Sequence, residues 1–266
     1  MGVFDSGMGG LTVLRALCDR LPHEHFIYLG DTARLPYGTK SAATVQRYAE
    51  RAAAALIQRG VRALVIACNT ASAYALEALA ERYAPLPVFG VIEPGARAAV
   101  AAAATQGTAP RVLVLATEAT VRQGAYAQAL LRARTDARVL CRPAPLLVAL
   151  AESGEPDGPL AEAILTDALR TPGTVSQVVL GCTHFPLFRA TLGRLLPAST
   201  TLIDSAVTTA EAVARTLGSD DADAGGVAPA VTERCRFLAT DDPRRFARLG
   251  ERFLGVGIET VELIDL

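Results

Sequence analysis

The stretch VVLGCTHFP at residues 178–186 combines a short apolar run, a glycine, three polar side chains and a proline. This order predicts a buried strand, a tight polar loop and a helix with proline in its first turn. The loop would lie at the carboxyl end of the strand, where ligands bind in open α/β sheets. Backbone N–H groups at such a helix start favour an anion or a thiolate. The stretch therefore predicts a chemically active loop.

The same arrangement occurs earlier in the chain, in the stretch LVIACNTA at residues 64–71. An apolar run again ends in a small residue, and a cysteine, two polar side chains and a helical segment follow. Cys68 and Cys182 are thus expected at the same kind of junction between a strand and a helix. A site in which two thiols approach one atom from opposite sides would require this arrangement, whereas a single-thiol site would not.

Alternating strand and helix patterns run through the whole chain, which is typical of an α/β fold with parallel sheets. The strands expected first along the chain are residues 2–4, 26–29, 64–67 and 88–92. The alternation then restarts, with strands expected at residues 111–116, 137–141, 178–181 and 201–203. The tail is expected to return to the first set, with a strand, a helix and a strand at residues 234–239, 243–253 and 259–263.

These patterns predict two pseudo-symmetric α/β domains with mainly parallel sheets and an active site in the cleft between them. The first domain would comprise residues 1–95 and 206–266 and carry Cys68. The second would comprise residues 96–205 and carry Cys182.

Three local predictions concern the ends of helices. Residues 93–95 are expected to form a loop, with a helix beginning at Ala96. The helix after Cys182 is expected to continue to Leu195. Residues 218–229 are rich in Asp, Gly and Ala, which predicts a mobile surface loop.

Charge and composition exclude several classes of protein. The formal net charge of the 266 residues is −1 and the sequence pI is about 6.3, which gives no electrostatic footprint for nucleic acid. No apolar segment reaches the roughly 18 uncharged residues of a membrane span. Residues 1–10 contain Asp5 and no basic region, unlike a signal peptide. The five cysteines lack metal-type spacing and suit a reducing compartment, so we expect a cytoplasmic protein without nucleic-acid or membrane partners.

The chain contains a single lysine, Lys40, among its 26 basic side chains. Pyridoxal phosphate enzymes hold their cofactor on a lysine Schiff base. Lys40 lies in the polar segment YGTKS, without a predicted pocket around it. A pyridoxal phosphate enzyme is therefore not expected.

The repeated cysteines admit four interpretations. Cys68 and Cys182 could exchange protons with carbon from opposite faces, as thiolate and thiol. Cys182 and His184 could instead form a nucleophile for acyl transfer, which leaves Cys68 without a role. The two thiols and His184 could also bind zinc, although no fourth ligand is evident. Finally, both thiols could be small buried apolar groups. This last interpretation is the one we adopt for the remaining cysteines, Cys18, Cys141 and Cys235.

Six short motifs occur in one order along nearly the whole chain. They are FDSGxGG (4–10), PYG (36–38), ACNT (67–70), GVIEPG (90–95), GCTHFP (181–186) and IDS (203–205). Together they resemble the glutamate racemases of the aspartate/glutamate racemase family. The resemblance implies a cofactor-independent, metal-free isomerase that interconverts L- and D-glutamate and supplies D-glutamate for peptidoglycan synthesis. It also implies two pseudo-symmetric domains, usually in a homodimer.

The resemblance assigns roles to individual residues. Cys68 is similar to the thiol that takes the proton from D-glutamate, and Cys182 to the thiol that takes it from L-glutamate. Asp5 and His184 resemble their respective helpers, and Glu152 a further acidic helper. The substrate contacts implied by the resemblance are Asp5, Ser6, Pro36, Tyr37, Gly38, Asn69, Thr70, Thr117, Thr120, Thr183 and His184.

Overall fold

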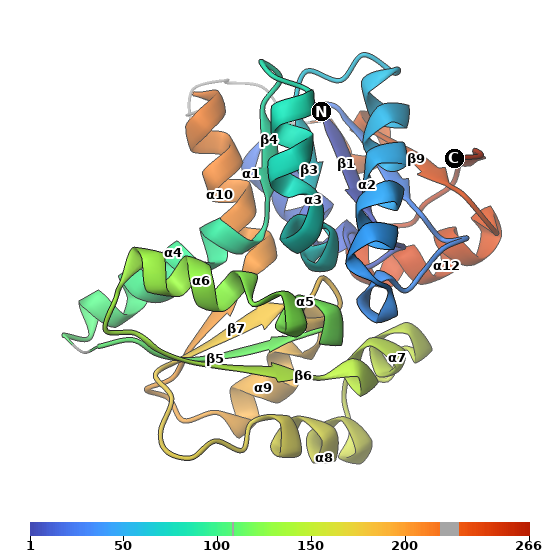
Figure 1. Cartoon of the computed structure of the whole chain (residues 1–266). Helices are drawn as coiled ribbons and strands as arrows, with labels where there is room; N and C mark the ends of the chain where they lie inside the picture. The colour runs from blue at the N-terminus through green and yellow to red at the C-terminus, as the bar shows by residue number, and fades with distance from the viewer. Residues whose placement is uncertain (108, 219–228) are drawn as a thin grey trace.

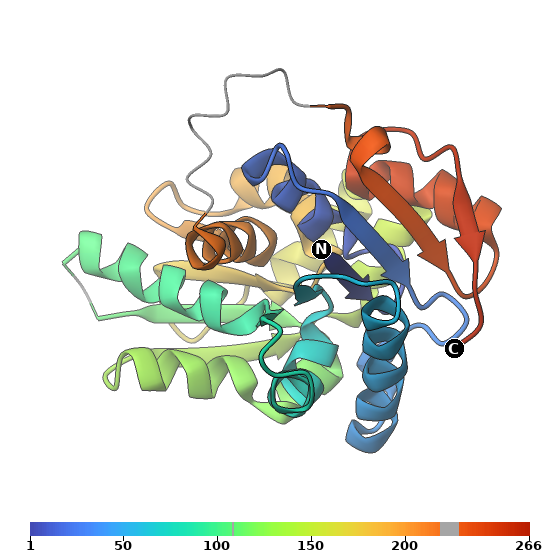
Figure 2. The same cartoon turned by 90° about the horizontal axis from the view of Figure 1, so that it is seen from above.

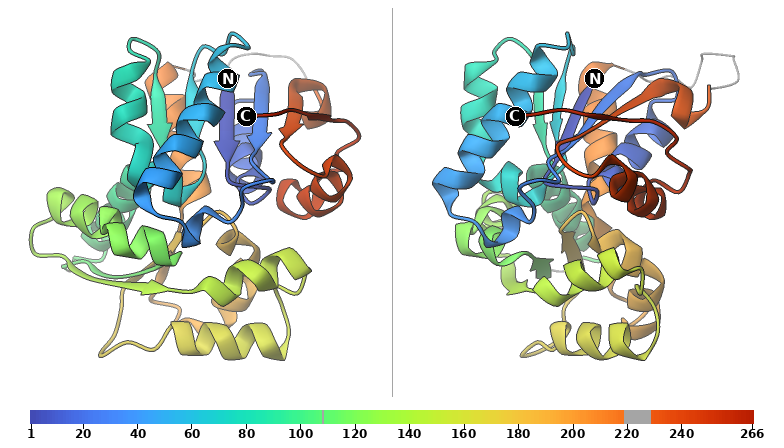
Figure 3. Two further views of the ribbon diagram at one scale, coloured as in Figure 1. Left: turned by 45° about the vertical axis from the view of Figure 1, so that its right-hand side comes forward. Right: turned by 90° about the vertical axis from the view of Figure 1, so that its right-hand side faces the viewer.

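A computed structural model describes residues 1–107, 109–218 and 229–266 and contains two parallel β-sheets with helices packed on them (Figure 1). The prediction of an α/β fold with two parallel sheets is confirmed. In both views of Figure 3 the part built on the first sheet lies above the part built on the second. Within the described ranges, no helix combines the length and the apolar character needed to cross a membrane.

The first sheet has the strand order β10-β9-β2-β1-β3-β4. Its strands are β1 (Gly2–Asp5), β2 (Phe26–Gly30), β3 (Leu64–Ile66), β4 (Val88–Gly90), β9 (Cys235–Ala239) and β10 (Val261–Leu263). All neighbouring strands run parallel. The C-terminal strands join this sheet because β9 pairs with β2, and Figure 2 shows these red strands beside the blue N-terminal ones.

The second sheet has the strand order β6-β5-β7-β8, again with parallel neighbours. Its strands are β5 (Arg111–Ala116), β6 (Arg138–Pro143), β7 (Gln177–Gly181) and β8 (Thr201–Asp204). The sheets thus contain the strands expected for two domains. The domain limits 1–95 plus 206–266 and 96–205 stay a prediction.

The helices connect successive strands and cover the sheets. The longer helices are α1 (Leu11–Arg20), α2 (Ala42–Ile57), α3 (Asn69–Arg82), α4 (Ile92–Thr105), α6 (Ala125–Ala133), α7 (Pro145–Ser153), α8 (Pro159–Ala168), α10 (Ser205–Leu217) and α12 (Pro243–Leu254). The shorter ones are α5 (Glu118–Gln123), α9 (Arg189–Leu195), α11 (Val231–Arg234) and the 3₁₀ turns η1 (Tyr37–Thr39) and η2 (Phe185–Phe188).

Successive side chains of a strand point to opposite faces of its sheet, and here both faces are buried. Val3 of β1 belongs to a core shared with α1, whereas Phe4 belongs to a core shared with α2 and α3. The first of these cores continues into the second sheet, because α10 packs against both α1 and α4. A shared apolar core therefore holds the two sheets together.

Two predicted helix boundaries are wrong. Helix α4 begins at Ile92 and includes Glu93-Pro94-Gly95, instead of beginning at Ala96. Pro94 is tolerated there because the first turn of a helix needs no N–H donor from it. After Cys182 the chain forms the 3₁₀ turn η2 before α9, so the helix to Leu195 is not continuous. Most of the loop expected at residues 218–229 lies outside the described residues.

Candidate active site

A cavity of about 280 Å³ opens where the carboxyl ends of strands from both sheets meet. Its lining on the side of the first sheet comprises Ser6, Gly7, residues 35–39, Cys68, Asn69 and Thr70. Its lining on the side of the second sheet comprises Thr117, Glu118, Pro145, Val148, Ala149, Glu152, Cys182, Thr183 and His184. The structure thus brings the two repeated strand–cysteine–helix junctions to one pocket, from different sheets.

Two of the residues singled out from the sequence lie behind the pocket wall. Asp5 ends β1 and is fully buried, and its carboxylate accepts a hydrogen bond of 3.0 Å from the N–H of Gly7. Thr120 is buried in α5, where its hydroxyl lies 3.1 Å from that of Thr70 and 2.9 Å from that of Thr117. All the other residues implied by the resemblance line the pocket.

The sequence patterns did not predict the apolar residues of the pocket wall. Pro145, Val148 and Ala149 line the cavity together with Glu152 because all four lie on one face of α7. The sequence spacing could have indicated these residues, since residues three, four and seven positions before Glu152 share its helix face. Leu35 precedes the PYG motif and carried no signal of its own.

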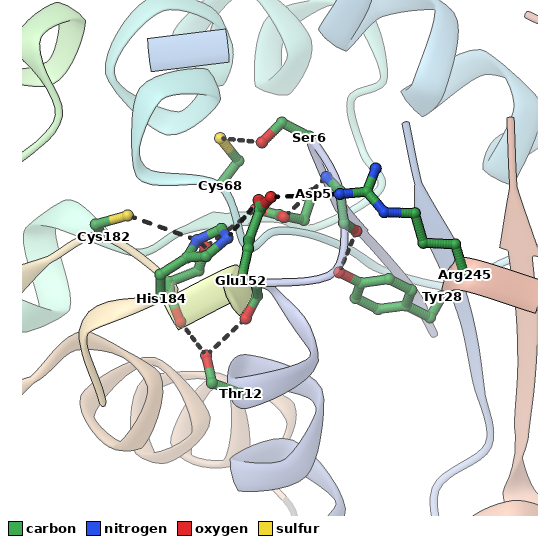
Figure 4. Close-up of polar contacts among 12 residues, drawn as sticks. Asp5, Ser6, Thr12, Tyr28, Cys68, Glu152, Cys182, His184 and Arg245 are labelled. Atoms are coloured by element: carbon green, nitrogen blue, oxygen red, sulfur yellow. Dashed lines mark hydrogen bonds and ion pairs between the residues drawn. The ribbon is translucent and has the colours of Figure 1, made fainter. Parts of the chain in front are cut away.

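Cys68 is held at the start of α3. Its sulfur accepts a hydrogen bond of 3.5 Å from the N–H of Ala71, and its S–H donates to the hydroxyl of Ser6 at 3.8 Å (Figure 4). Burial, and then the nearby charge of Asp5, raises the pKa of Cys68 to about 12. This group is therefore a neutral thiol, and a proton donor, at pH 7.

Asp5 is the acidic group that can assist the Cys68 thiol. Burial raises the pKa of Asp5, and the charge of His184 and the backbone N–H groups of Gly10 and Gly7 oppose this rise. The hydroxyl of Thr183 also donates to the carboxylate at 3.5 Å. A buried carboxyl of this kind can take and return a proton.

Cys182 belongs to a chain of polar contacts, drawn in Figure 4. Its sulfur lies 3.8 Å from Nδ1 of His184, and Nε2 of His184 lies 3.2 Å from Oε1 of Glu152. Burial alone would lower the pKa of His184, but its hydrogen bonds with Cys182 and Glu152 outweigh this and raise it to about 10. The hydrogen bond with His184 lowers the pKa of Glu152. Cys182 therefore faces an imidazolium at pH 7.

The loop that carries His184 is fixed from the side of the first sheet. Thr12 of α1 donates a hydrogen bond of 2.9 Å to the carbonyl of Thr183. A Cβ at position 9 would lie only 2.4 Å from Nδ1 of His184, so this close approach requires Gly9. The ring of Phe253 contacts the His184 ring edge-on, with centroids 5.2 Å apart. Packing across the two sheets thus sets the orientation of the imidazole.

The pocket wall is rich in uncharged hydrogen-bond donors. The hydroxyls of Thr70 and Thr117 lie 2.9 Å apart, although Thr70 lies in α3 beside the first sheet and Thr117 precedes α5 beside the second. The side-chain N–H₂ of Asn69 is buried and has no hydrogen-bond partner among the described residues. Among the lining residues, His184 is the single basic side chain. Such donors suit carboxylate groups without requiring an arginine or lysine in the pocket.

The geometry gives less support to a zinc site or to a pyridoxal phosphate enzyme. Among the described residues, no cluster of three or more His, Cys, Asp or Glu side chains could hold a metal ion, so Cys68, Cys182 and His184 do not form a zinc triad here. Lys40 does not line the pocket. The other three cysteines also lie outside it, and the sulfurs of Cys18 and Cys235 are 3.6 Å apart in the core.

Comparisons of the sequence and of the fold with known proteins point to the same family. The Asp/Glu/Hydantoin racemase family matches residues 11–213. The chain is 44% identical to the glutamate racemase of Koribacter versatilis, covering 100% of this chain and 97% of the relative. The solved glutamate racemase of Thermus thermophilus in complex with β-chloro-D-alanine has a TM-score of 0.86 and 42% identity, covering 100% and 96% of the chains. That of Francisella tularensis in complex with D-glutamate has a TM-score of 0.87 and 33% identity, covering 99% and 96%.

Proposed function

The chain belongs to the glutamate racemases of the Asp/Glu/hydantoin racemase family, and we propose that it interconverts L- and D-glutamate by proton transfer between two thiols. It is therefore an isomerase. The observation that carries the mechanism is the convergence of Cys68 and Cys182 on one pocket from different sheets. Inversion at a carbon atom needs one group to remove a proton and another to deliver one on the opposite face.

In the reaction of L-glutamate, Cys182 acts as the base and Cys68 as the acid. Next to the His184 imidazolium, Cys182 acts as a thiolate and removes the α-proton, so a C–H bond breaks and an S–H bond forms. The neutral thiol of Cys68 then delivers its proton to the opposite face, which gives D-glutamate and a thiolate. The protons must be redistributed before the next L-glutamate reacts.

The reaction of D-glutamate runs through the same groups in reverse. Cys68 must first lose its proton, and the buried carboxyl of Asp5 is the helper suited to this task. Cys182 then donates a proton to the other face of the α-carbon, and His184 can return a proton to Cys182. The two thiols have different helpers, so Asp5 prepares Cys68 to react with D-glutamate and His184 prepares Cys182 to react with L-glutamate, while both directions pass through the same groups.

The substrate fits the pocket by hydrogen bonding. Glutamate carries two carboxylates, and the hydroxyls of Thr70, Thr117 and Thr183 can donate to such groups. The unpartnered N–H₂ of Asn69 offers a further donor. Neutral donors of this kind orient an anion at modest energetic cost.

A single-thiol reaction is the second candidate, because Cys182, His184 and Glu152 form a linear chain of contacts. Such a chain also occurs where a histidine activates a nucleophilic thiol for acyl transfer. This alternative gives Cys68 no chemical task, although Cys68 lines the same pocket.

Incubation of the purified protein with L-glutamate in D₂O tests the proposal. Optical rotation should decay to zero, and the D-glutamate formed should carry deuterium at the α-carbon. In the earliest phase the recovered L-glutamate should carry much less deuterium, because the proton is removed and delivered by different groups. Loss of rotation without α-deuteration, or no loss at all, would exclude two-thiol racemisation.

The cellular role and assembly form part of the same proposal. The product would supply D-glutamate for peptidoglycan synthesis, and the protein would act in the cytoplasm as a homodimer. The five free thiols support a reducing compartment. Light scattering combined with gel filtration tests the dimer, and growth of a depleted strain with and without added D-glutamate tests the cellular role.

A further inference from the structure

Tyr126 and Asn69 form a hydrogen bond between two helices that lie beside different sheets. Tyr126 lies in α6, beside the second sheet, and Asn69 begins α3, beside the first. The hydroxyl of Tyr126 donates to Oδ1 of Asn69 at 2.7 Å, and both side chains are buried. Burial raises the pKa of Tyr126, so its hydroxyl keeps the proton that it donates.

The Tyr126 ring packs beside two glycines. A Cβ at Gly181 would lie 3.0 Å from the ring, and a Cβ at Gly95 would lie 3.5 Å from it. Gly181 immediately precedes Cys182, so the ring packs against the strand end that carries this thiol. The buried ring is therefore packed closely against this strand end, with its hydroxyl at Asn69.

This hydrogen bond decides which end of the Asn69 amide is left without a partner. A carboxamide has one acceptor end and one donor end. Tyr126 occupies the acceptor, Oδ1, while the donor, Nδ2, is buried without a partner among the described residues and belongs to a pocket-lining side chain. A buried donor without a partner is costly unless a ligand satisfies it.

We propose that Tyr126 is a positioning residue that holds the Asn69 amide with its N–H₂ toward the pocket, where it donates to a carboxylate of the substrate. This assignment rests on the proposed function. Rotation of the amide by half a turn would present Oδ1 to the carboxylate and repel it. The Tyr126 hydroxyl opposes this rotation, because its proton is donated to Oδ1 and would lose that acceptor.

Tyr126→Phe tests the assignment, since it removes the hydroxyl and keeps the buried ring. We expect KM to rise by about 10-fold for both enantiomers, because one hydrogen bond to a charged group is no longer aligned. We expect kcat to change less than about two-fold, because the contact is made equally in ground state and transition state. The dissociation constant of D-glutamate, measured by calorimetry, should rise in parallel with KM.

Tyr74→Phe is the matched control. Tyr74 of α3 also donates its hydroxyl from the side of the first sheet to the side of the second, at 3.1 Å to the carbonyl of Ala119, and among the described residues its hydroxyl is not hydrogen-bonded to Asn69. Its KM should stay within about two-fold of the unmodified protein. A merely structural role of Tyr126 would lower the melting temperature and leave KM unchanged, as in this control.

Coupling to Asn69 gives a second readout. In an Asn69→Ala background, Tyr126→Phe should cause no further rise in KM, because the group that it positions is gone. Asn69→Asp keeps the acceptor for Tyr126 and replaces the donor by an oxygen. Its KM should exceed that of Asn69→Ala by about 10-fold or more, and this holds even if Tyr126→Phe does not fold.

Several results would overturn the inference. They are normal KM in folded Tyr126→Phe, losses that add fully in the double variant, and an Asn69→Asp protein that binds glutamate as well as Asn69→Ala. Each of them, observed while the unmodified protein racemises glutamate, leaves the proposed function intact. An unmodified protein that does not racemise glutamate would overturn the proposed function and this inference with it.

Discussion

Nε2 of His184 lies 3.2 Å from Oε1 of Glu152, and this contact turns Nδ1 toward the sulfur of Cys182, 3.8 Å away. Cys68 has no such chain and instead contacts the hydroxyl of Ser6. The two thiols therefore occupy unlike surroundings, although each follows a strand of similar sequence.

Both thiols should be essential. Cys68→Ala and Cys182→Ala should each lower racemisation by at least about 10³-fold, and the double variant should be scarcely worse, because the thiols act as a unit. Circular dichroism of L- and D-glutamate solutions measures the rate. Cys141→Ala is the control, because Cys141 lies in β6 outside the pocket. Near-normal racemisation by folded Cys68→Ala would favour the single-thiol reaction.

Asp5→Asn should lower kcat/KM by about 10²–10⁴-fold, the usual worth of general acid–base assistance. The enantiomers have equal free energy in water, so the equilibrium constant is one and kcat/KM must fall equally in both directions. Any asymmetry must appear in kcat and KM separately, measured from each enantiomer. A loss of only a few-fold would indicate that Asp5 acts mainly as an acceptor for the N–H of Gly7.

Stability should fall as the pH rises above 6.5. The folded protein holds the His184 proton with a pKa of about 10, against 6.5 for a free histidine. This contribution is therefore fully present below pH 6.5 and is lost as the pH rises toward 10, by up to about 1.4 kcal/mol per pH unit. Urea unfolding between pH 6.5 and 9 measures it.

Two variants assign this pH dependence. His184→Asn should remove most of the slope, and Glu152→Gln should reduce it, because the hydrogen bond to Glu152 helps to raise the pKa of His184. His25→Asn is the control, since His25 is exposed. A slope that persists in His184→Asn would show that another group holds the proton.

Racemisation should not require a metal ion or cofactor. Dialysis against a chelator should leave kcat/KM unchanged, and the purified protein should show no absorbance band above 300 nm. The expectation rests on the single lysine, which lies outside the pocket, and on two thiols that suffice for the chemistry. Activity that is lost on dialysis and restored by zinc would refute the two-thiol mechanism.

Much of the pocket could be predicted because its polar residues occur in short contiguous motifs. Cys182, Thr183 and His184 are neighbours in sequence, and the apolar run before them places them at a strand end. Val148 and Ala149 were not predicted because an apolar residue on a helix face packs equally well in a core. The start of α4 was missed because Pro94 is compatible with both a loop and a first helical turn.

The sequence by itself determined the alternation of strands and helices, the two strand–cysteine–helix junctions and the family. These features follow from local periodicity and from residues close together in the chain. Only the tertiary structure decided which distant groups meet. Tyr126 reaches Asn69, Thr12 reaches Thr183, and Glu152 reaches His184 because two sheets share a core, and no local pattern encodes such contacts. Burial in that core also sets the protonation of Cys68 and His184, since desolvation depends on everything packed around a group.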